Sequence, residues 1–217
     1  MVGGSLLCPM TPFAHLVFTL CCACYAVAFV LEVFRLTQRG NFKLHVVNWR
    51  ILPAIIGLVC HTFLIYQQHV VAEQPLGGAA MLFLASAWGL ALVYCVWVCR
   101  YPNIPFGIIL LPIAMLLLGS GYYWASTVET TGLSLPSLAK MLHIVSAAGF
   151  VIAISVSVIC RILYYLEVRL LRKKRSLTPP IKLPSLEWSK TVSRVSLMIA
   201  VCCLGLCALG GIVSLLL

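Results

Sequence analysis

Six long apolar runs, separated by shorter polar stretches, dominate the sequence. Each run is close to the length of about 20 residues that an α-helix needs to cross a hydrocarbon core of about 30 Å. The alternating pattern of membrane-spanning β-strands is absent from these runs. We therefore predict an all-α fold, a polytopic transmembrane helix bundle with about six spans, forming one integral membrane domain over residues 1–217. The predicted spans are 12–34, 51–71, 79–99, 106–126, 138–166 and 195–217.

Composition supports a membrane protein. Hydrophobic residues make up 62% of the chain and charged residues 9%, against roughly 25% charged residues in soluble domains. A soluble chain of 217 residues would need more polar side chains to cover its surface, so we expect the lipid bilayer to be its main partner. The net charge of +10 comes from basic residues at the ends of apolar runs, which favours orientation signals over nucleic acid binding.

The basic residues lie in alternate connections between the runs. They follow the first, third and fifth predicted spans, and the densest group is a basic loop over residues 169–194. The opposite connections carry Glu73 and Glu129, with no basic residue before Lys140. The positive-inside rule makes the basic side cytoplasmic, so we expect both termini on the outer side. The membrane we expect is the cytoplasmic (inner) membrane of a bacterium.

All of the eleven cysteines except Cys8 lie in or at the ends of apolar runs. Buried cysteine behaves as a small apolar residue, and small residues favour close helix packing in lipid. Neither the group around Cys22 nor the pair Cys202 and Cys203 has the spacing of a zinc site. We expect these residues to pack rather than to bind metal.

His61 lies near the middle of the second predicted span, about 15 Å from each end. Ionisable groups at that depth are costly and commonly functional, which makes this histidine a candidate ligand or proton relay. The other interpretation is a neutral imidazole bonded to a neighbouring helix. Both stay open.

His143 lies about one helical turn into the fifth predicted span, three residues after Lys140. An imidazole here can be an axial haem ligand, and the Lys140 ammonium can pair with a haem propionate. In the alternative interpretation, His143 is an ordinary interfacial residue and Lys140 extends to lipid headgroups.

Depth complicates the pairing of these histidines. His69 lies almost at the outer end of the second span and matches the depth of His143 better than His61 does. Two axial nitrogens lie about 4 Å apart across an iron, so a pair of His61 and His143 needs a tilted helix or a different span boundary. His15, near the outer end of the first span, is another candidate on that side.

Several charged residues, two tryptophans and two prolines have structural interpretations. Helical spacing and proximity favour charge pairs for Glu32 with Arg35 and for Glu167 with Arg161. Trp88 and Trp97 lie in the third span and either line a porphyrin cavity or pack against lipid and helices, and packing is favoured. Pro53 starts the second helix, and Pro112 kinks the fourth.

Four segments of the chain resemble the cytochrome c assembly membrane protein family, in its HemX-like branch. They are LPAIIGLVCHTFLIYQQHV, FGIILLPIAMLLLGS, SLAKMLHIVSAAGFVIAISVSVICRILYYLEVRLLRKKR and PPIKLPSLEWSKTVSRVSLMIAVCCLGLCALGG. Their order is the distinctive feature: a histidine in the second span, a leucine-proline fourth span, a Leu-His opening the fifth, then a basic loop. The chain lacks the family's tryptophan-rich outer motif, and we expect it to be short of the family's last spans.

The resemblance implies haem handling during cytochrome c maturation, with His61 and His143 at positions that resemble the family's haem-ligating histidines. We predict that the protein binds or passes haem toward the outer face, with His61, His69, His143 and Lys140 as candidate haem-binding residues. Apocytochrome c or other maturation proteins are the partners that this function implies.

Two other functions stay open. The first is a non-haem assembly or regulatory membrane protein that docks a cytoplasmic partner through its basic loop. The second, a solute transporter, is disfavoured because intramembrane carboxylates and broken half-helices are lacking from the pattern. No catalytic triad, phosphate-binding glycine loop or zinc-protease motif is present in the sequence, so we do not expect an enzyme.

Overall fold

The computed structural model describes residues 12–37, 45–68, 79–101, 104–127, 137–172 and 185–216. In these residues the regular elements are helices and no strand occurs, which confirms the all-α prediction. The α-helices are α1 (Pro12–Thr37), α2 (His45–Tyr66), α3 (Ala79–Arg100), α4 (Gly107–Thr127), α5 (Ser137–Arg172) and α6 (Leu186–Leu216).

The length and composition of the helices confirm an integral membrane bundle. Five of the described helices are long and apolar enough to cross a membrane, namely α1, α3, α4, α5 and α6. The apolar part of α2, Ile51–Tyr66, is shorter. Two glutamines follow Tyr66, and residues 69–71 of the predicted second span lie outside the described residues.

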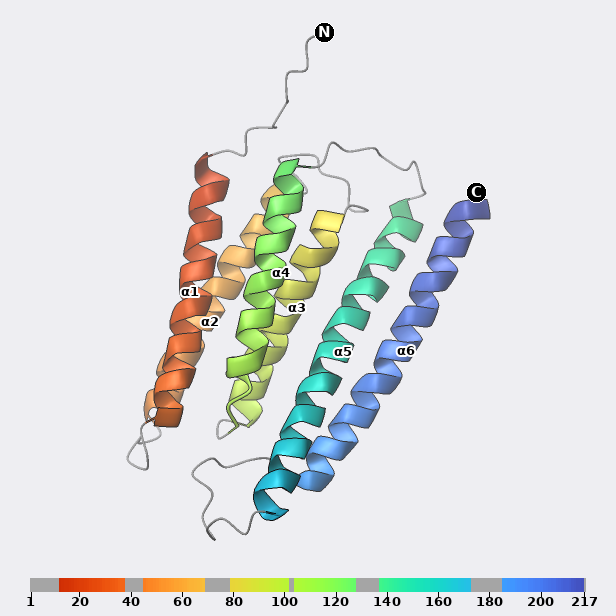
Figure 1. The fold of residues 1–217 in the computed structure, drawn as a ribbon. Helices are drawn as coiled ribbons and strands as arrows, with labels where there is room; N and C mark the ends of the chain where they lie inside the picture. Colours follow the sequence, from red (N-terminus) through yellow and green to blue (C-terminus); the bar gives the residue numbers. More distant parts are fainter. Residues whose placement is uncertain are drawn as a thin grey trace.

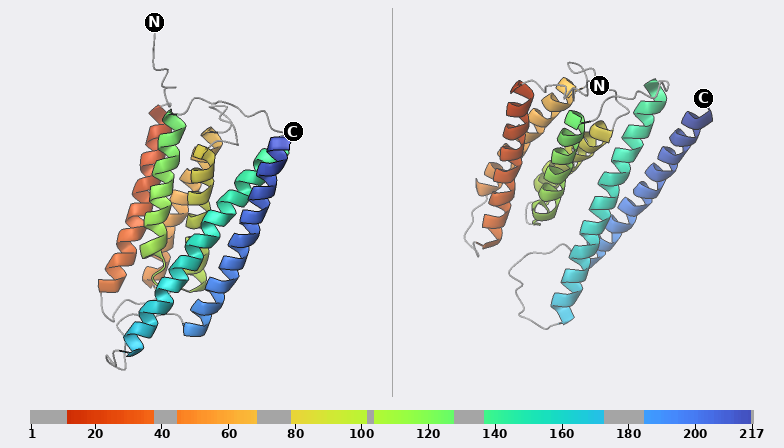
Figure 2. Two further views of the ribbon diagram at one scale, coloured as in Figure 1. Left: turned by 45° about the vertical axis from the view of Figure 1, so that its right-hand side comes forward. Right: turned by 45° about the horizontal axis from the view of Figure 1, so that its top comes forward.

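The helices form two groups that run roughly alongside each other (Figure 1). Helices α1, α2, α3 and α4 pack around a shared core, α5 packs against α3, and α6 packs almost entirely against α5. The turned views also place α5 and α6 together at one edge of the bundle (Figure 2). The start of α1 and the end of α6 lie at the same end of the bundle, as six helices of alternating direction require.

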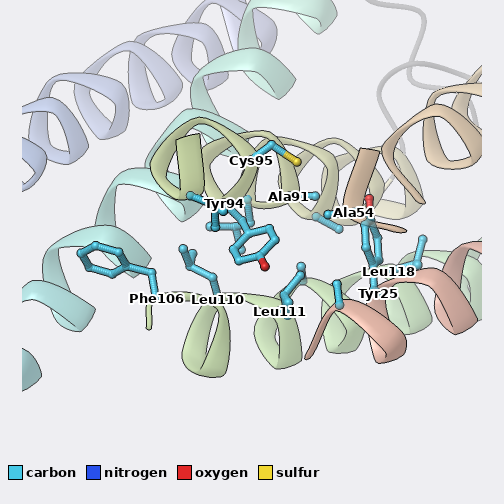
Figure 3. Close-up of a cluster of buried hydrophobic side chains, with 14 of the residues drawn as sticks. Tyr25, Ala54, Ala91, Tyr94, Cys95, Phe106, Leu110, Leu111 and Leu118 are labelled. Atoms are coloured by element: carbon cyan, nitrogen blue, oxygen red, sulfur yellow. The ribbon is translucent and has the colours of Figure 1, made fainter. Parts of the chain in front are cut away.

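The buried core lies mainly between α1, α2, α3 and α4. Tyr94, Phe106, Leu110 and Leu118 are among its largest fully buried side chains (Figure 3). Glycines let the helices approach closely, because a Cβ atom at Gly121 would lie 3.1 Å from the carbonyl oxygen of Ala80. Such small residues suit helix association in lipid, where packing rather than water exclusion drives contact.

The basic loop was predicted over residues 169–194, with the last span starting at residue 195. Both ends of this loop differ in the structure. Helix α5 continues to Arg172, and α6 begins at Leu186. At 36 residues, α5 is about 54 Å long, well beyond a hydrocarbon core of about 30 Å. The basic residues at these positions therefore lie on helices rather than in a loop.

Local contacts explain the early start of α6. Ser185 caps the helix, because its Oγ accepts a hydrogen bond from the backbone N–H of Trp188 at 3.3 Å. The Trp188 ring packs against Tyr101 and Phe106, with ring centroids 5.1 Å and 5.8 Å apart. This aromatic contact holds the first turns of α6 against the adjoining ends of α3 and α4.

The two prolines lie inside their helices. Pro53 does not start α2, which begins eight residues earlier at His45. Neighbouring groups in a membrane bundle can satisfy the backbone carbonyl that such a proline leaves unpaired. Pro112 lies inside α4, as predicted, and its kink stays a prediction.

Candidate functional site

His61 is fully buried on α2 and faces α1. A hydrogen bond of 3.3 Å joins its Nδ1 to the hydroxyl of Tyr25. Gly57, one turn earlier on α2, makes room for this contact, since a Cβ there would lie 2.8 Å from the Tyr25 ring. The other ring nitrogen, Nε2, has no hydrogen-bond partner among the described residues. Nδ1 of His61 thus joins α2 to α1 by a hydrogen bond. Nε2 is a buried polar atom with no partner in the described part of the chain.

His143 lies in the second turn of α5 and is exposed. Its Nδ1 lies 3.3 Å from the backbone carbonyl oxygen of Cys207 on α6 and 3.4 Å from the Sγ atom of the same residue. Gly210 lies opposite, where a Cβ would be 3.7 Å from the Cβ of His143. With Nδ1 donating to the carbonyl, Nε2 is left as the acceptor nitrogen.

The remaining candidates lie at the same end of the bundle or outside the described residues. His69 is not described, and the side chain of Lys140 is not described, although its backbone lies in α5 one turn before His143. His15 is exposed on α1 and forms a hydrogen bond with the Tyr122 hydroxyl on α4.

The structure does not bring His61 and His143 together. The imidazole of His61 contacts α1, whereas the imidazole of His143 contacts α6. Helices α3 and α4 lie between the α1–α2 pair and the α5–α6 pair (Figures 1 and 2). A single iron would need the two ligating nitrogens about 4 Å apart, so these histidines form two separate sites.

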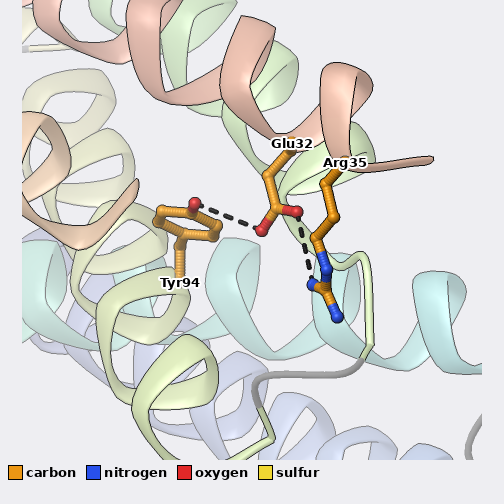
Figure 4. Close-up of polar contacts among 3 residues, drawn as sticks. All are labelled: Glu32, Arg35 and Tyr94. Atoms are coloured by element: carbon orange, nitrogen blue, oxygen red, sulfur yellow. Dashed lines mark hydrogen bonds and ion pairs between the residues drawn. The ribbon is translucent and has the colours of Figure 1, made fainter. Parts of the chain in front are cut away.

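A buried carboxylate at the basic end of the bundle has a partner, Tyr94, that the sequence pattern did not predict. Glu32 is fully buried, and the Tyr94 hydroxyl donates a hydrogen bond of 3.3 Å to its Oε1 (Figure 4). Arg35 forms an ion pair with Oε2 at 3.7 Å, which confirms the predicted pairing. Gly107, the first residue of α4, makes room, because a Cβ there would lie 2.8 Å from the Glu32 Cγ. The carboxylate links the ends of α1 and α3 beside the start of α4.

The second predicted charge pair is absent from the part of the chain that the structure describes. No ion pair joins Glu167 to Arg161 there, and the buried Oε2 of Glu167 has no hydrogen-bond partner. The two residues are six positions apart on α5, so they lie on different faces of the helix.

Both tryptophans of α3 make contacts between helices. The Trp88 Nε1–H donates a hydrogen bond of 2.9 Å to the Thr62 hydroxyl on α2. Trp97 packs against Phe106, with ring centroids 4.2 Å apart. The predicted packing roles of both residues are confirmed.

Across the described ranges, no group of three or more His, Cys, Asp or Glu side chains could hold a metal ion. Ten cysteines in those ranges are free thiols. Any metal held by the described residues would therefore have at most two of these side chains as ligands.

The fold and its polar contacts define the class, a helical integral membrane protein with histidines at two separate places. No family model, curated protein or solved structure matches the chain. The likeness to cytochrome c assembly proteins therefore rests on the sequence segments alone.

Proposed function

We propose that this chain is a membrane protein of cytochrome c biogenesis that binds or passes haem, with His143 as an axial ligand. The supporting observation is the contact of its Nδ1 with the Cys207 carbonyl at 3.3 Å. Metal-ligating histidines almost always donate the second ring N–H to a carbonyl, a carboxylate or water, which fixes the tautomer and the ring orientation. The Cys207 carbonyl would perform that role here and leave Nε2 free to bind the iron.

The surroundings of His143 suit a flat apolar ligand. Leu142 and Val145 are exposed beside it on α5, and Leu206 and Leu209 are exposed on the neighbouring turns of α6. A porphyrin on this surface would replace lipid contacts with side-chain contacts of similar polarity. The iron supplies the Lewis-acid centre that a neutral imidazole binds.

His61 is enclosed against α1 and would not share an iron with His143, so His69 stays the sequence-based candidate for a second residue that would hold the haem. Lys140 lies one turn before His143 on α5 and would offer its ammonium to a propionate. The protein would hold and orient haem for apocytochrome c or another maturation protein, without catalysing a reaction alone.

The proposal is tested by the haem content of protein purified in mild detergent from cells supplied with haem. We expect haem to co-purify with the wild-type protein and with His15→Ala. This variant is the matched control, because it also removes an exposed histidine at the same end of the bundle. We expect His143→Ala to lose most of the bound haem. Equal haem content in the two variants, or none in the wild type, would reject the assignment.

A second function has its own supporting observation. The last turn of α5 carries exposed Arg169 and Arg172, on a helix longer than the hydrocarbon core needs. A rigid basic projection of this kind would suit docking of an acidic cytoplasmic partner by a regulatory membrane protein. Replacing both arginines with glutamine would then abolish capture of that partner, with no dependence on His143.

A further inference from the structure

A small pocket of about 90 Å³ lies between α5 and α6, in the half of these helices where the basic residues gather. Two of its lining residues come from one face of α5, and four come from the first turns of α6. They are Arg161, Tyr164, Ser189, Lys190, Ser193 and Arg194. None of these residues has a part in the proposed haem site, which lies at the opposite end of the same helix pair.

The floor of the pocket is held by a reciprocal pair of hydrogen bonds between the two helices. Ser157 Oγ donates to the Ser193 carbonyl at 3.0 Å, and Ser193 Oγ donates to the Ser157 carbonyl at 3.2 Å. Both serines are buried. The spacing of α5 and α6 is therefore fixed beside the pocket before any ligand enters.

Ser189 marks a place for an acceptor atom. Its side chain is 0% exposed, and its Oγ has no hydrogen-bond partner in the described parts of the chain. A buried hydroxyl without a partner is unfavourable, because it has lost its hydrogen bonds to water. An oxygen atom of a ligand in the pocket would accept its hydrogen bond.

The charge of the pocket is positive and uncompensated. Arg161, Lys190 and Arg194 are exposed, and none of them forms an ion pair with a described residue. Glu187 lies one turn before Lys190 on α6 but does not pair with it. The positive end of the α6 dipole adds to the same field, since the helix begins at Leu186.

We propose that this pocket binds the phosphate group of an anionic phospholipid. Arginine presents a planar fork that matches phosphate oxygens, and basic pockets between membrane helices bind anionic headgroups. Arg161 lies eight residues before Arg169, the end of the apolar part of α5, which is about 12 Å along the helix. That position lies inside the apolar part of α5, so the long Arg161 side chain would extend toward the headgroup layer to hold the phosphate group there.

The surface beside the pocket favours a lipid over a soluble phosphate. Leu197, Met198 and Val201 continue along α6 from Arg194 and are all exposed. Acyl chains attached to a phosphate in the pocket can lie along this apolar strip. A soluble phosphate would make no use of it.

Native mass spectrometry of the protein in neutral detergent, with added phosphatidylglycerol or phosphatidylcholine, tests the proposal. We expect the wild-type protein to retain phosphatidylglycerol in preference to phosphatidylcholine. The double variant Arg161→Gln, Arg194→Gln should weaken phosphatidylglycerol binding by about tenfold or more, because two charged hydrogen bonds are lost. Ser189→Ala keeps every charge and should give a smaller loss, of a few fold.

The matched control is Arg169→Gln, Arg172→Gln, which removes the same charge from the exposed end of α5 outside the pocket. Equal weakening in the two double variants would overturn the site, since binding would then follow net charge alone. Equal retention of both lipids would also overturn it. In a separate arm, displacement of phosphatidylglycerol by equimolar inorganic phosphate would overturn the lipid assignment, and persistence of the lipid supports it.

Discussion

At the scale of single residues, the hydrogen bond between Tyr25 and His61 joins α1 to α2 within a largely apolar core. Both side chains are fully buried, so neither can exchange this bond for one to water. Replacing Tyr25 with phenylalanine would leave both ring nitrogens of His61 without a partner among the described side chains. The bond therefore contributes to stability whatever the function of His61.

We expect Tyr25→Phe to lower the free energy of unfolding by about 1 kcal/mol, the usual range for hydrogen bonds between membrane helices. Thermal unfolding in detergent measures this change. Tyr165→Phe is the matched control, because Tyr165 is 65% exposed on α5 and makes no hydrogen bond that the structure shows. Equal shifts in the two variants would show that the Tyr25 hydroxyl has no such role.

The sequence predicted the depth of His61 but not its partner. Depth in the membrane follows from counting along the second apolar run and stays a prediction, whereas the structure shows that the residue is buried within the protein. The direction of its side chain depends on how α2 is rotated against α1, and helices that are apolar on every side give little information about rotation. The contact of Tyr94 with Glu32 was missed for the same reason, since 62 positions separate the two residues.

At the scale of helices, two glycines of α4 differ in their surroundings. A Cβ atom at Gly121 would lie 2.9 Å from Leu84 Cγ and 3.1 Å from two backbone atoms of α3. At Gly119, two residues earlier, nothing would lie within 4 Å of it. An alanine at Gly121 would therefore test the close packing of α4 against α3. An alanine at Gly119 would test helix propensity alone.

We expect Gly121→Ala to destabilise the protein by about 1–3 kcal/mol, because backbone atoms of α3 cannot move aside without separating the helices. Gly119→Ala should be neutral or stabilising by up to about 1 kcal/mol, the propensity of alanine over glycine. Thermal unfolding of both variants under one condition compares them. A stabilised Gly121→Ala variant would contradict the close packing of α3 and α4.

Helix ends were the least predictable feature at this scale. The start of α6 was placed nine residues too late, because Lys190 and Arg194 were interpreted as loop charges. Long basic side chains can extend from a helix to the headgroups, so such charges do not end it. Ser185 before Glu187 is a helix-start signal that was present in the sequence. The aromatic contact of Trp188 could not be predicted, because its partners Tyr101 and Phe106 lie between the end of α3 and the start of α4, far away in the sequence.

At the scale of the whole molecule, the described helices alternate in direction and, apart from Lys140, collect the basic residues at one end. The positive-inside rule then predicts that this end is cytoplasmic. Alkaline phosphatase fused after Leu217 should be active, and green fluorescent protein fused after Arg172 should fluoresce. The reverse pattern of the two reporters would contradict the orientation and place the His143 end inside the cell.

The number of helices and their order could be predicted from the sequence, but not the neighbours of each helix. Apolar runs of spanning length specify helices directly. Which helices touch depends on side-chain packing, and the structure places α6 beside α5 at one edge rather than within a ring. That arrangement separates His61 from His143, a separation that counting along the chain could not establish.

The most direct test of the central claim is the absorption spectrum of the haem-loaded protein, compared between wild type and His143→Ala. If Nε2 of His143 ligates the iron, the variant should lose the wild-type spectrum, and added imidazole should restore it by replacing the missing ligand. The His61→Ala variant should keep the wild-type spectrum, since His61 faces α1. A wild-type spectrum in His143→Ala without imidazole would contradict the account.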